Sequence, residues 1–204
     1  MTPFLRHMDE IDQEITLAIN GMHSAFTDSL ATLFSDIKVW FPLYAIVAAF
    51  MFSRLGVKKG FIAILALGLT ILACDQCANF VKDSVARLRP CYNTRMLEGG
   101  LHMLEKRGGL FGFYSGHASN AFGFAMCAIA CIKSDSSQKY LGFTSATLFW
   151  ATLVGLSRIM AGKHYLGDVL FGTLAGILIG AVIGFAARYI FIHREEKTGI
   201  RQEK

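Results

Sequence analysis

Residues 61–81 read FIAILALGLTILACDQCANFV, an apolar run in which Asp75 is the only charged residue. At the rise of an α-helix, a run of this length crosses the roughly 30 Å of hydrocarbon in a bilayer. Further apolar runs lie at 39–52, 117–132, 141–160 and 165–192, and 53% of the 204 residues are hydrophobic. The sequence therefore predicts an all-α fold, an integral membrane helical bundle with about five transmembrane helices.

The segment before these runs, residues 1–38, has a different pattern. Apolar residues recur in it at helical spacing and acidic residues fall between them. This pattern predicts an amphipathic helix that lies at the membrane interface, although a solvated helix packed on the bundle would show it equally. We therefore expect an N-terminal interfacial segment at 1–38, a membrane domain at 39–192 and a charged tail at 193–204.

The formal net charge of +5 comes largely from basic residues in the connections between apolar runs. Such a distribution favours contact with a membrane surface, and we expect no nucleic-acid partner. With five spans, one side of the membrane holds the connections near Arg54 and Lys133 together with the tail. The positive-inside rule makes that side cytoplasmic and places the acid-rich N-terminus outside.

The connection at 82–116 is long for a compact bundle, which indicates a functional role. It begins with Lys82 and Arg89, which are seven residues apart and would share one helix face, and Pro90 discourages further helix. Arg87 falls off that face and is expected only to snorkel to the interface. A snorkelling belt at the end of a span would explain all of these basic residues equally.

Two further polar strings fall at the same membrane face. Ser115 and Gly116 precede the run that begins at His117, which places free amides of a helix N-terminus where an anion can bind. A simple serine N-cap is the alternative for this string. Later, His164 and Asp168 are four residues apart, so the carboxylate can hold one ring nitrogen and leave the other free as a nucleophile.

Arg158 precedes His164 by six residues and offers a planar guanidinium for phosphate oxygens. A His-Asp pair of purely structural use remains the alternative. The other histidines, His7, His23, His102 and His193, lie outside these strings and are expected at the interface or in solvent, with His102 of interest only because it lies in the long connection.

These strings resemble the type 2 phosphatidic acid phosphatase superfamily, which shares a core with vanadium haloperoxidases. The family pattern is Lys, six intervening residues and Arg-Pro, then Pro-Ser-Gly-His, then Ser-Arg, five intervening residues and His, with three more residues before Asp. The first and third parts match from Lys82 and from Ser157. The second part departs from the pattern, because Tyr114 stands where the family usually has proline.

The resemblance implies a membrane lipid phosphatase with a phosphohistidine intermediate on His164. His117 would protonate the leaving oxygen, and Asp168 would orient His164. The residues expected to hold the phosphoryl group are Lys82, Arg89, Ser115, Gly116 and Arg158. Because cations of the protein would balance the phosphate charge, no metal ion and no cofactor are expected.

A lipid transporter or flippase, and a catalytically silent member of the same fold that binds anionic lipid, are the alternatives. A transporter would place polar residues near mid-span, whereas these charges gather at one face. The expected substrates are lipid phosphates such as undecaprenyl diphosphate, phosphatidylglycerophosphate, phosphatidate or lipid A, with a slight preference for the first. We expect a multi-pass protein of the bacterial cytoplasmic membrane whose active site faces the periplasm or cell exterior.

Overall fold

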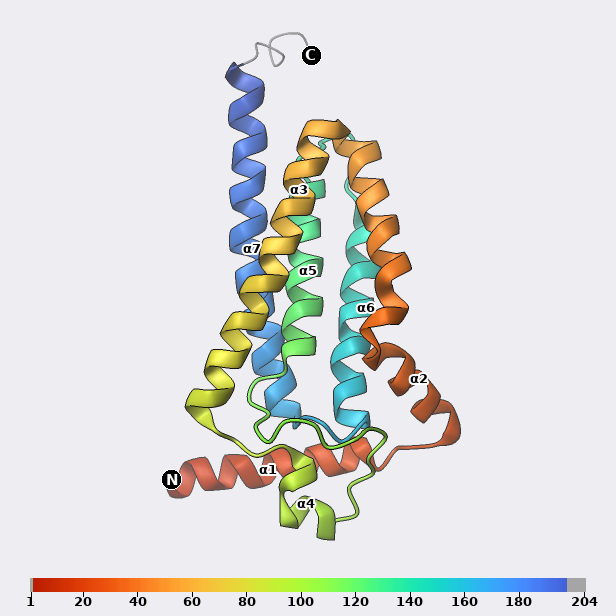
Figure 1. Cartoon of the computed structure of the whole chain (residues 1–204), viewed down its shortest axis with the longest axis vertical. Coiled ribbons are helices and arrows are strands. Elements are labelled where there is room, and N and C mark those ends of the chain that lie inside the picture. The colour runs from red at the N-terminus through yellow and green to blue at the C-terminus, as the bar shows by residue number, and fades with distance from the viewer. Residues whose placement is uncertain (1, 198–204) are drawn as a thin grey trace.

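The computed structural model describes residues 2–197, with side chains to His193. The described residues form helices and no strand, which confirms the all-α prediction. The helices are α1 (Pro3–Asn20), α2 (Ala25–Ser35), η1 (Ile37–Trp40), α3 (Phe41–Val85), η2 (Pro90–Tyr92), α4 (Thr94–Glu98), α5 (Gly116–Ile132), α6 (Leu141–Met160) and α7 (Leu166–Lys197). Figure 1 shows α3, α5, α6 and α7 upright, with α1 and α4 at one end of them.

Helix α3 contains two of the expected spans, because it folds back on itself at Gly56. This residue has φ of 75° and ψ of 171°, a backbone conformation that glycine adopts without the strain of a side chain. The two arms of α3 run in opposite directions from this bend (Figure 1). The expected runs 39–52 and 61–81 therefore become one helical hairpin rather than two helices joined by a loop.

Three helical stretches are long and apolar enough to cross a membrane: Ile37–Val85, Leu141–Met160 and Leu166–His193. Helix α5 is apolar too, but its 17 residues make it shorter than these. The integral membrane bundle is confirmed, and the number of five spans stays a prediction, with the two arms of α3 and the helices α5, α6 and α7 as its candidates.

Helix α5 packs closely against α7 because glycines of α7 recur every fourth residue on the contact face. A Cβ on Gly172 would lie 2.5 Å from the carbonyl oxygen of Ser115, and one on Gly176 would overlap the backbone of Ser119. Small residues at this spacing allow two helix backbones to approach in a membrane. The approach brings the start of α7, which His164 directly precedes, beside the first turn of α5, which contains His117.

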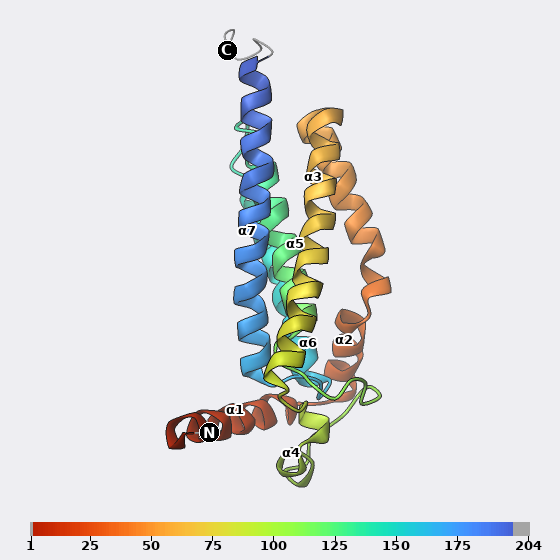
Figure 2. The same ribbon diagram turned by 60° about the vertical axis from the view of Figure 1, so that its left-hand side comes forward.

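Helix α1 lies across one end of the bundle, nearly perpendicular to the long helices (Figures 1 and 2). Its polar residues Thr16 and Asn20 are buried against α6 and α7, whereas Phe4 and Met8 are exposed. Helix α1 therefore packs on the bundle, as the alternative required, and its position at the membrane interface or in solvent stays a prediction.

The long connection contains more regular structure than we expected, because η2, α4 and a bridge between Leu88 and Phe111 lie within it. The expected tail at 193–204 begins inside α7, which continues to Lys197. Residues 198–204 of that tail lie outside the described residues.

Candidate active site

His164 is held at the start of α7 by the carboxylate of Asp168. Its Nδ1 lies 3.3 Å from Asp168 Oδ2, and the same oxygen accepts a hydrogen bond from the backbone N–H of Tyr165 at 3.1 Å. Asp168 therefore closes the N-terminus of α7 in the manner of a capping box. His164 precedes the helix, so the pair meets across a helix start and not along one helix face as we expected.

The second oxygen of Asp168 receives Arg87, whose Nη1 lies 2.8 Å from Oδ1. Arg87 also contacts Asp9 at 2.6 Å and Asp12 at 2.8 Å, both on α1. The prediction that Arg87 only snorkels is therefore wrong. Helix α3 ends at Val85, and the turn that follows directs Arg87 inward to the buried carboxylate.

Lys82 and Arg89 both line the same cavity, but they do not share a helix face. Ala86 ends α3 in the left-handed conformation with φ of 50°, and Arg89 lies in extended backbone beyond it. The Arg89 side chain is held by a hydrogen bond from Nε to the Phe111 carbonyl at 3.1 Å. The two cations thus approach the cavity from different elements, a helix and a loop.

The N-terminus of α5 begins at Gly116, directly beside Lys82. A Cβ built on Gly116 would lie 3.5 Å from Lys82 Nζ, so the ammonium group sits against this glycine. Ser115 is fully buried, accepts a hydrogen bond from the Ala118 amide and donates its own amide to the Asp168 carbonyl at 2.9 Å. Ser115 therefore serves as the N-cap, and its expected contact with phosphate stays a prediction.

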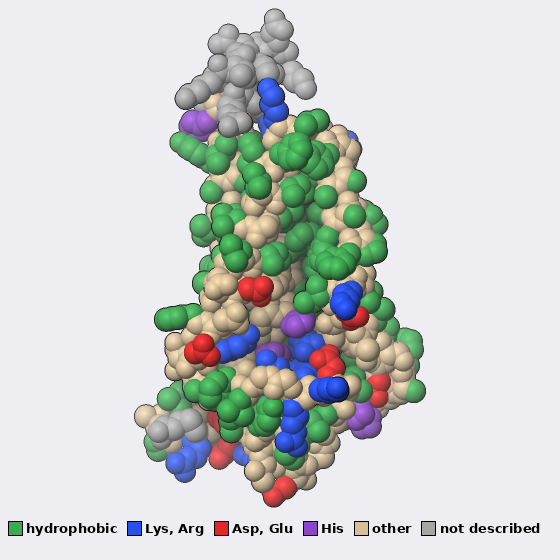
Figure 3. All heavy atoms as spheres, in the orientation of Figure 1, with side chains coloured by type: hydrophobic (Ala, Val, Ile, Leu, Met, Phe, Trp, Pro, Cys, Tyr) green, Lys and Arg blue, Asp and Glu red, His purple; other side chains and the backbone are tan. Residues whose placement is uncertain are grey.

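A cavity of about 530 Å³ joins these groups. Its polar end is lined by Lys82, Arg89, Gly116, His117, Arg158 and His164. Its remaining wall is mostly apolar and aromatic, from η1, α3, α5 and α6, with Trp40, Tyr44, Phe124 and Trp150 among its residues. Figure 3 shows the face hollowed at this place, with histidine and basic side chains at the lower end of the hollow and apolar ones above.

Six of the eight expected site residues thus line one cavity, and Ser115 and Asp168 lie directly behind its wall. The three parts of the family pattern correctly predicted that segments up to 86 residues apart in sequence, as Lys82 and Asp168 are, meet at one place. A cavity with cations at one end and aromatic rings along the other suits an anionic head group with an apolar body.

Glu105 is a residue of this site that the sequence did not reveal. Its carboxylate pairs with both terminal nitrogens of Arg158, at 3.0 and 3.4 Å, and lies 3.7 Å from Lys163 Nζ. Although burial alone would raise the pKa of Glu105, the charge of Arg158 lowers it below its ordinary value. Glu105 is therefore an anion bound to the guanidinium that we expected to bind phosphate.

His164 is held neutral by its surroundings. Burial, together with the nearby cations Arg158 and Arg89, lowers the pKa of its imidazole to about 4 against the opposing effect of Asp168. With Nδ1 paired to Asp168, the hydrogen-bond arrangement assigns the lone pair to Nε2. A neutral, oriented imidazole beside fixed cations can act as a nucleophile toward a bound phosphoryl group.

Comparison with known proteins agrees with this geometry. The family model described as the PAP2 superfamily matches residues 61–191, which include all the motifs above. The chain belongs to the PAP2 superfamily. The family resemblance inferred from the motifs is thereby confirmed.

Similar proteins are known from bacteria. A lipid A 4'-phosphatase of Bacteroides thetaiotaomicron is 28% identical over 198 residues, covering 96% of this chain and 85% of that protein. The crystal structure of a transmembrane PAP2 type phosphatidylglycerolphosphate phosphatase from Bacillus subtilis superimposes with a TM-score of 0.62 at 20% identity, over 97% of this chain and 90% of the other. That of Aquifex aeolicus LpxE gives 0.60 at 25% identity, over 83% and 92%. The expected enzyme class, a phosphatase in a bacterial membrane, is thereby confirmed.

The sequence did not reveal the roles of Asp9, Asp12, Arg87 and Glu105, because their contacts join segments 53 to 81 residues apart. One signal was available for Arg87: a buried carboxylate has two oxygens, and His164 satisfies only one of them, so a second donor was required. The sequence offered no comparable signal for Glu105, which lies in a loop without periodicity.

Proposed function

We propose that this PAP2 phosphatase hydrolyses the phosphate monoester of a lipid, with lipid A as the substrate, through a phosphohistidine on His164. The observation that supports the chemistry most directly is the oriented pair of His164 and Asp168 at the cationic end of a cavity with an apolar wall. The similarity to a lipid A 4'-phosphatase over 96% of the chain supports the substrate.

In the first step, Nε2 of His164 attacks phosphorus and a P–N bond forms while the P–O bond to the lipid breaks. His117 lines the same cavity and would donate a proton to the leaving oxygen. Asp168 keeps the proton on Nδ1 and stabilises the imidazolium that develops. Lys82, Arg89, Arg158 and the amides at the start of α5 would hold the phosphoryl oxygens.

In the second step, water attacks the phosphohistidine, and His117 accepts a proton from it. The P–N bond breaks, inorganic phosphate leaves and His164 returns to its neutral form. Charge neutralisation by three basic side chains takes the place that divalent ions occupy in other phosphoryl-transfer sites. We therefore expect a chelator such as EDTA to leave the catalytic rate of the wild-type protein unchanged.

The test is phosphate release by the purified protein from lipid A, phosphatidylglycerophosphate, phosphatidate and undecaprenyl diphosphate. We expect lipid A to give the highest kcat/KM, with mass spectrometry showing the loss of one phosphate. A higher value for another lipid would overturn the substrate and leave the chemistry in place. Equal activity of the His164→Ala variant, checked for insertion and folding, would overturn the nucleophile.

The phosphohistidine has a test of its own. The reaction with a substrate labelled in its phosphate group should be stopped rapidly without acid. Labelled phosphate should then be found on the wild-type protein in a form that is stable to base and labile to acid. The label should be absent from His164→Ala. Label on another residue, or turnover with no labelled enzyme under single-turnover conditions, would contradict the intermediate.

The active site is proposed to face the periplasm or cell exterior, and the C-terminus the cytoplasm. The bend of α3, the connection between α5 and α6 and the end of α7 lie together at the end opposite the site (Figure 1). That end carries Arg54, Lys58, Lys59, Lys133 and Lys139. The concentration of basic residues there supports a cytoplasmic position by the positive-inside rule.

A further inference from the structure

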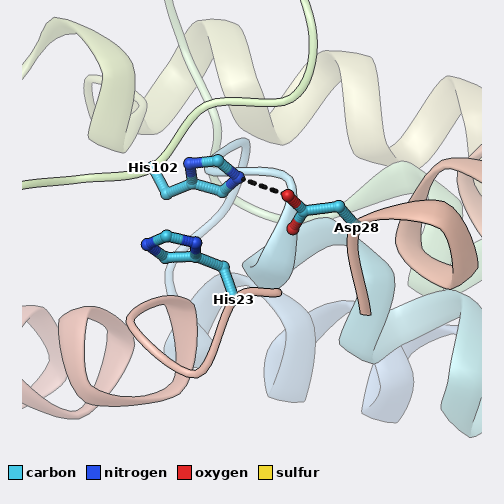
Figure 4. Close-up of side chains that lie close together, drawn as sticks. All are labelled: His23, Asp28 and His102. Carbon is cyan, nitrogen blue, oxygen red and sulfur yellow. Dashed lines mark hydrogen bonds and ion pairs between the residues drawn. The ribbon is translucent and has the colours of Figure 1, made fainter. Parts of the chain in front are cut away.

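Two histidines and an aspartate that the phosphatase chemistry does not use lie together outside the active-site cavity (Figure 4). They are His23, in the connection between α1 and α2, Asp28, in the first turn of α2, and His102, in the long loop. One donor atom from each side chain lies within 4.8 Å of the others. The sequence separation of 79 residues between His23 and His102 had concealed this cluster.

The ring of His102 already points its Nε2 at Asp28 Oδ2 over 3.0 Å, and His23 stacks on it with ring centroids 4.0 Å apart. The other oxygen of Asp28 is closed to solvent and has no hydrogen-bond partner among the described residues. A buried carboxylate oxygen without a partner is costly, and a cation beside it would remove that cost.

The backbone around two of these side chains is fixed from several directions. The amide of His102 donates to Asn20 Oδ1 at 2.8 Å, and its carbonyl accepts from Asn20 Nδ2 at 3.0 Å. Asn20 is itself buried and donates to the carbonyls of Ile159 and Met160 on α6. Asp28 follows a capping box formed by Ser24 and Thr27. Two of the three donors are thus held in place before any ligand arrives.

We propose that His23, Asp28 and His102 form a binding site for one divalent transition-metal ion of the zinc class. Two imidazole nitrogens and one carboxylate oxygen are a common donor set for Zn²⁺, and water would complete a tetrahedron. Ligand distances of about 2.1 Å require donor atoms about 3.4 Å apart. The His102–Asp28 pair, at 3.0 Å, lies close to this spacing. The exposed ring of His23, whose donor atom lies within 4.8 Å of the other two, would reach it by tilting out of the stack.

The bound ion would join the start of α2 to the loop that enters the active site. Glu105, which pairs with Arg158, follows His102 by only three residues. The metal would therefore fix one end of the segment that carries this carboxylate. Its role is to hold the loop, and the metal takes no part in the phosphoryl transfer proposed above.

The experiment is a titration of the purified, EDTA-treated full-length protein with Zn²⁺, with bound metal counted by elemental analysis after gel filtration and Tm followed in parallel. Co²⁺ serves as a second probe, because four-coordinate Co²⁺ absorbs visible light. We expect one Zn²⁺ per chain, a rise in Tm of several degrees and a visible spectrum with Co²⁺.

Three variants identify the ligands. His23→Phe keeps an aromatic ring stacked on His102 and removes the nitrogen, whereas Asp28→Asn keeps the shape of the side chain and removes its charge. Both should lose the stoichiometric metal and the rise in Tm. His7→Ala removes an exposed histidine of α1 that lies outside the cluster, and it should bind Zn²⁺ as the wild type does.

No stoichiometric binding by the wild type, or equal binding by wild type, His23→Phe and Asp28→Asn, would overturn the proposal. The latter result would mean adventitious surface binding, with the cluster acting only as an ion pair between His102 and Asp28. Because the readouts are metal content, Co²⁺ spectra and Tm, they do not depend on whether the phosphatase mechanism is correct.

Discussion

The carboxylate of Asp168 is shared between two partners, the imidazole of His164 and the guanidinium of Arg87. It is completely buried, so each oxygen requires a donor to offset the loss of water. Arg87 is in turn held by Asp9 and Asp12 and lies over the ring of Tyr165, 3.9 Å from its centroid. Arg87 is therefore placed to position the proposed nucleophile, His164, through Asp168.

Replacing Arg87 by glutamine should lower kcat by about 10- to 100-fold, the range typical of residues that orient a catalytic ligand. KM should change little, because Arg87 does not line the cavity. Steady-state kinetics of Arg87→Gln and Arg87→Lys would separate the effect on kcat from the effect on KM. The lysine variant should keep partial activity. Arg95→Gln is the matched control, because Arg95 pairs with Glu14 on an exposed surface. A higher KM with unchanged kcat would contradict the positioning role.

The carboxylate of Glu105 occupies the guanidinium of Arg158. Under the proposed mechanism Arg158 binds the phosphoryl group, so the substrate would have to displace this carboxylate. We expect Glu105→Gln to lower KM several-fold, because the neutral amide binds Arg158 more weakly than a carboxylate does. Inhibition by inorganic phosphate or vanadate should strengthen in the same variant. Glu98→Gln, at an exposed position of α4, is the control. A rise in KM would show instead that Glu105 helps to bind the lipid.

The low pKa of His164 predicts an acid limit to activity well below that of a free imidazole, which titrates near 6.5. Protonation removes the lone pair on Nε2, so kcat/KM should fall as the pH decreases through about 4. A fall on the alkaline side would belong to the proposed general acid, His117, which must carry a proton to act. Two substrates whose phosphates titrate differently should share this limit, and circular dichroism should show that the protein remains folded there. A limit near pH 6.5 with both substrates would contradict the buried, neutral imidazole.

For single residues, the sequence predicted which side chains come together better than it predicted how they are arranged. The spacing of His164 and Asp168 indicated the correct pair, although the helix begins only at Leu166. The expectation that Lys82 and Arg89 share a helix face was wrong, because helical periodicity does not reveal that the left-handed Ala86 ends α3 between them. Contacts that join distant segments, such as Arg87 with α1, had no local signature at all.

Among the elements, the pair of α5 and α7 positions the site. Gly172 and Gly176 let the two backbones touch, and this contact sets Asp168 next to Ser115. The apolar runs in the sequence predicted both helices, but they did not show which pairs of helices would be in contact. The stripe of glycines carried that information, because a residue without a side chain on a lipid-facing helix usually marks a helix contact.

A bulky side chain at Gly176 should separate these helices. We expect Gly176→Leu to destabilise the protein by about 1–3 kcal/mol, the usual cost of overpacking, and to lower activity as Asp168 moves from Ser115. Thermal unfolding in detergent and phosphate release would measure the two effects. Gly68→Leu is the control, since nothing lies within 4 Å of a Cβ at Gly68. Equal loss of stability in both variants would contradict the contact.

For the whole molecule, the separation of charge along the bundle predicts its orientation. Reporter fusions after Ser136 and after the end of α7 should give fluorescent green fluorescent protein and inactive alkaline phosphatase. Ser136 and Lys197, the last described residue of α7, lie at the basic end away from the site. A fusion after Gly100 should give the reverse result. The opposite pattern at all three points would place the active site in the cytoplasm.

The hydrogen bonds of α1 to the start of α7 also bear on how the protein is made. Asp12 accepts from the amide of Gly167 at 2.8 Å, and Thr16 accepts from Leu166 at 2.9 Å, across 155 and 150 residues of chain. A ribosome releases the first of these partners long before it releases the second. The surroundings of the proposed nucleophile, His164, are therefore incomplete until α7 has been synthesised. We expect a product truncated before α7 to release no phosphate from the lipids around it.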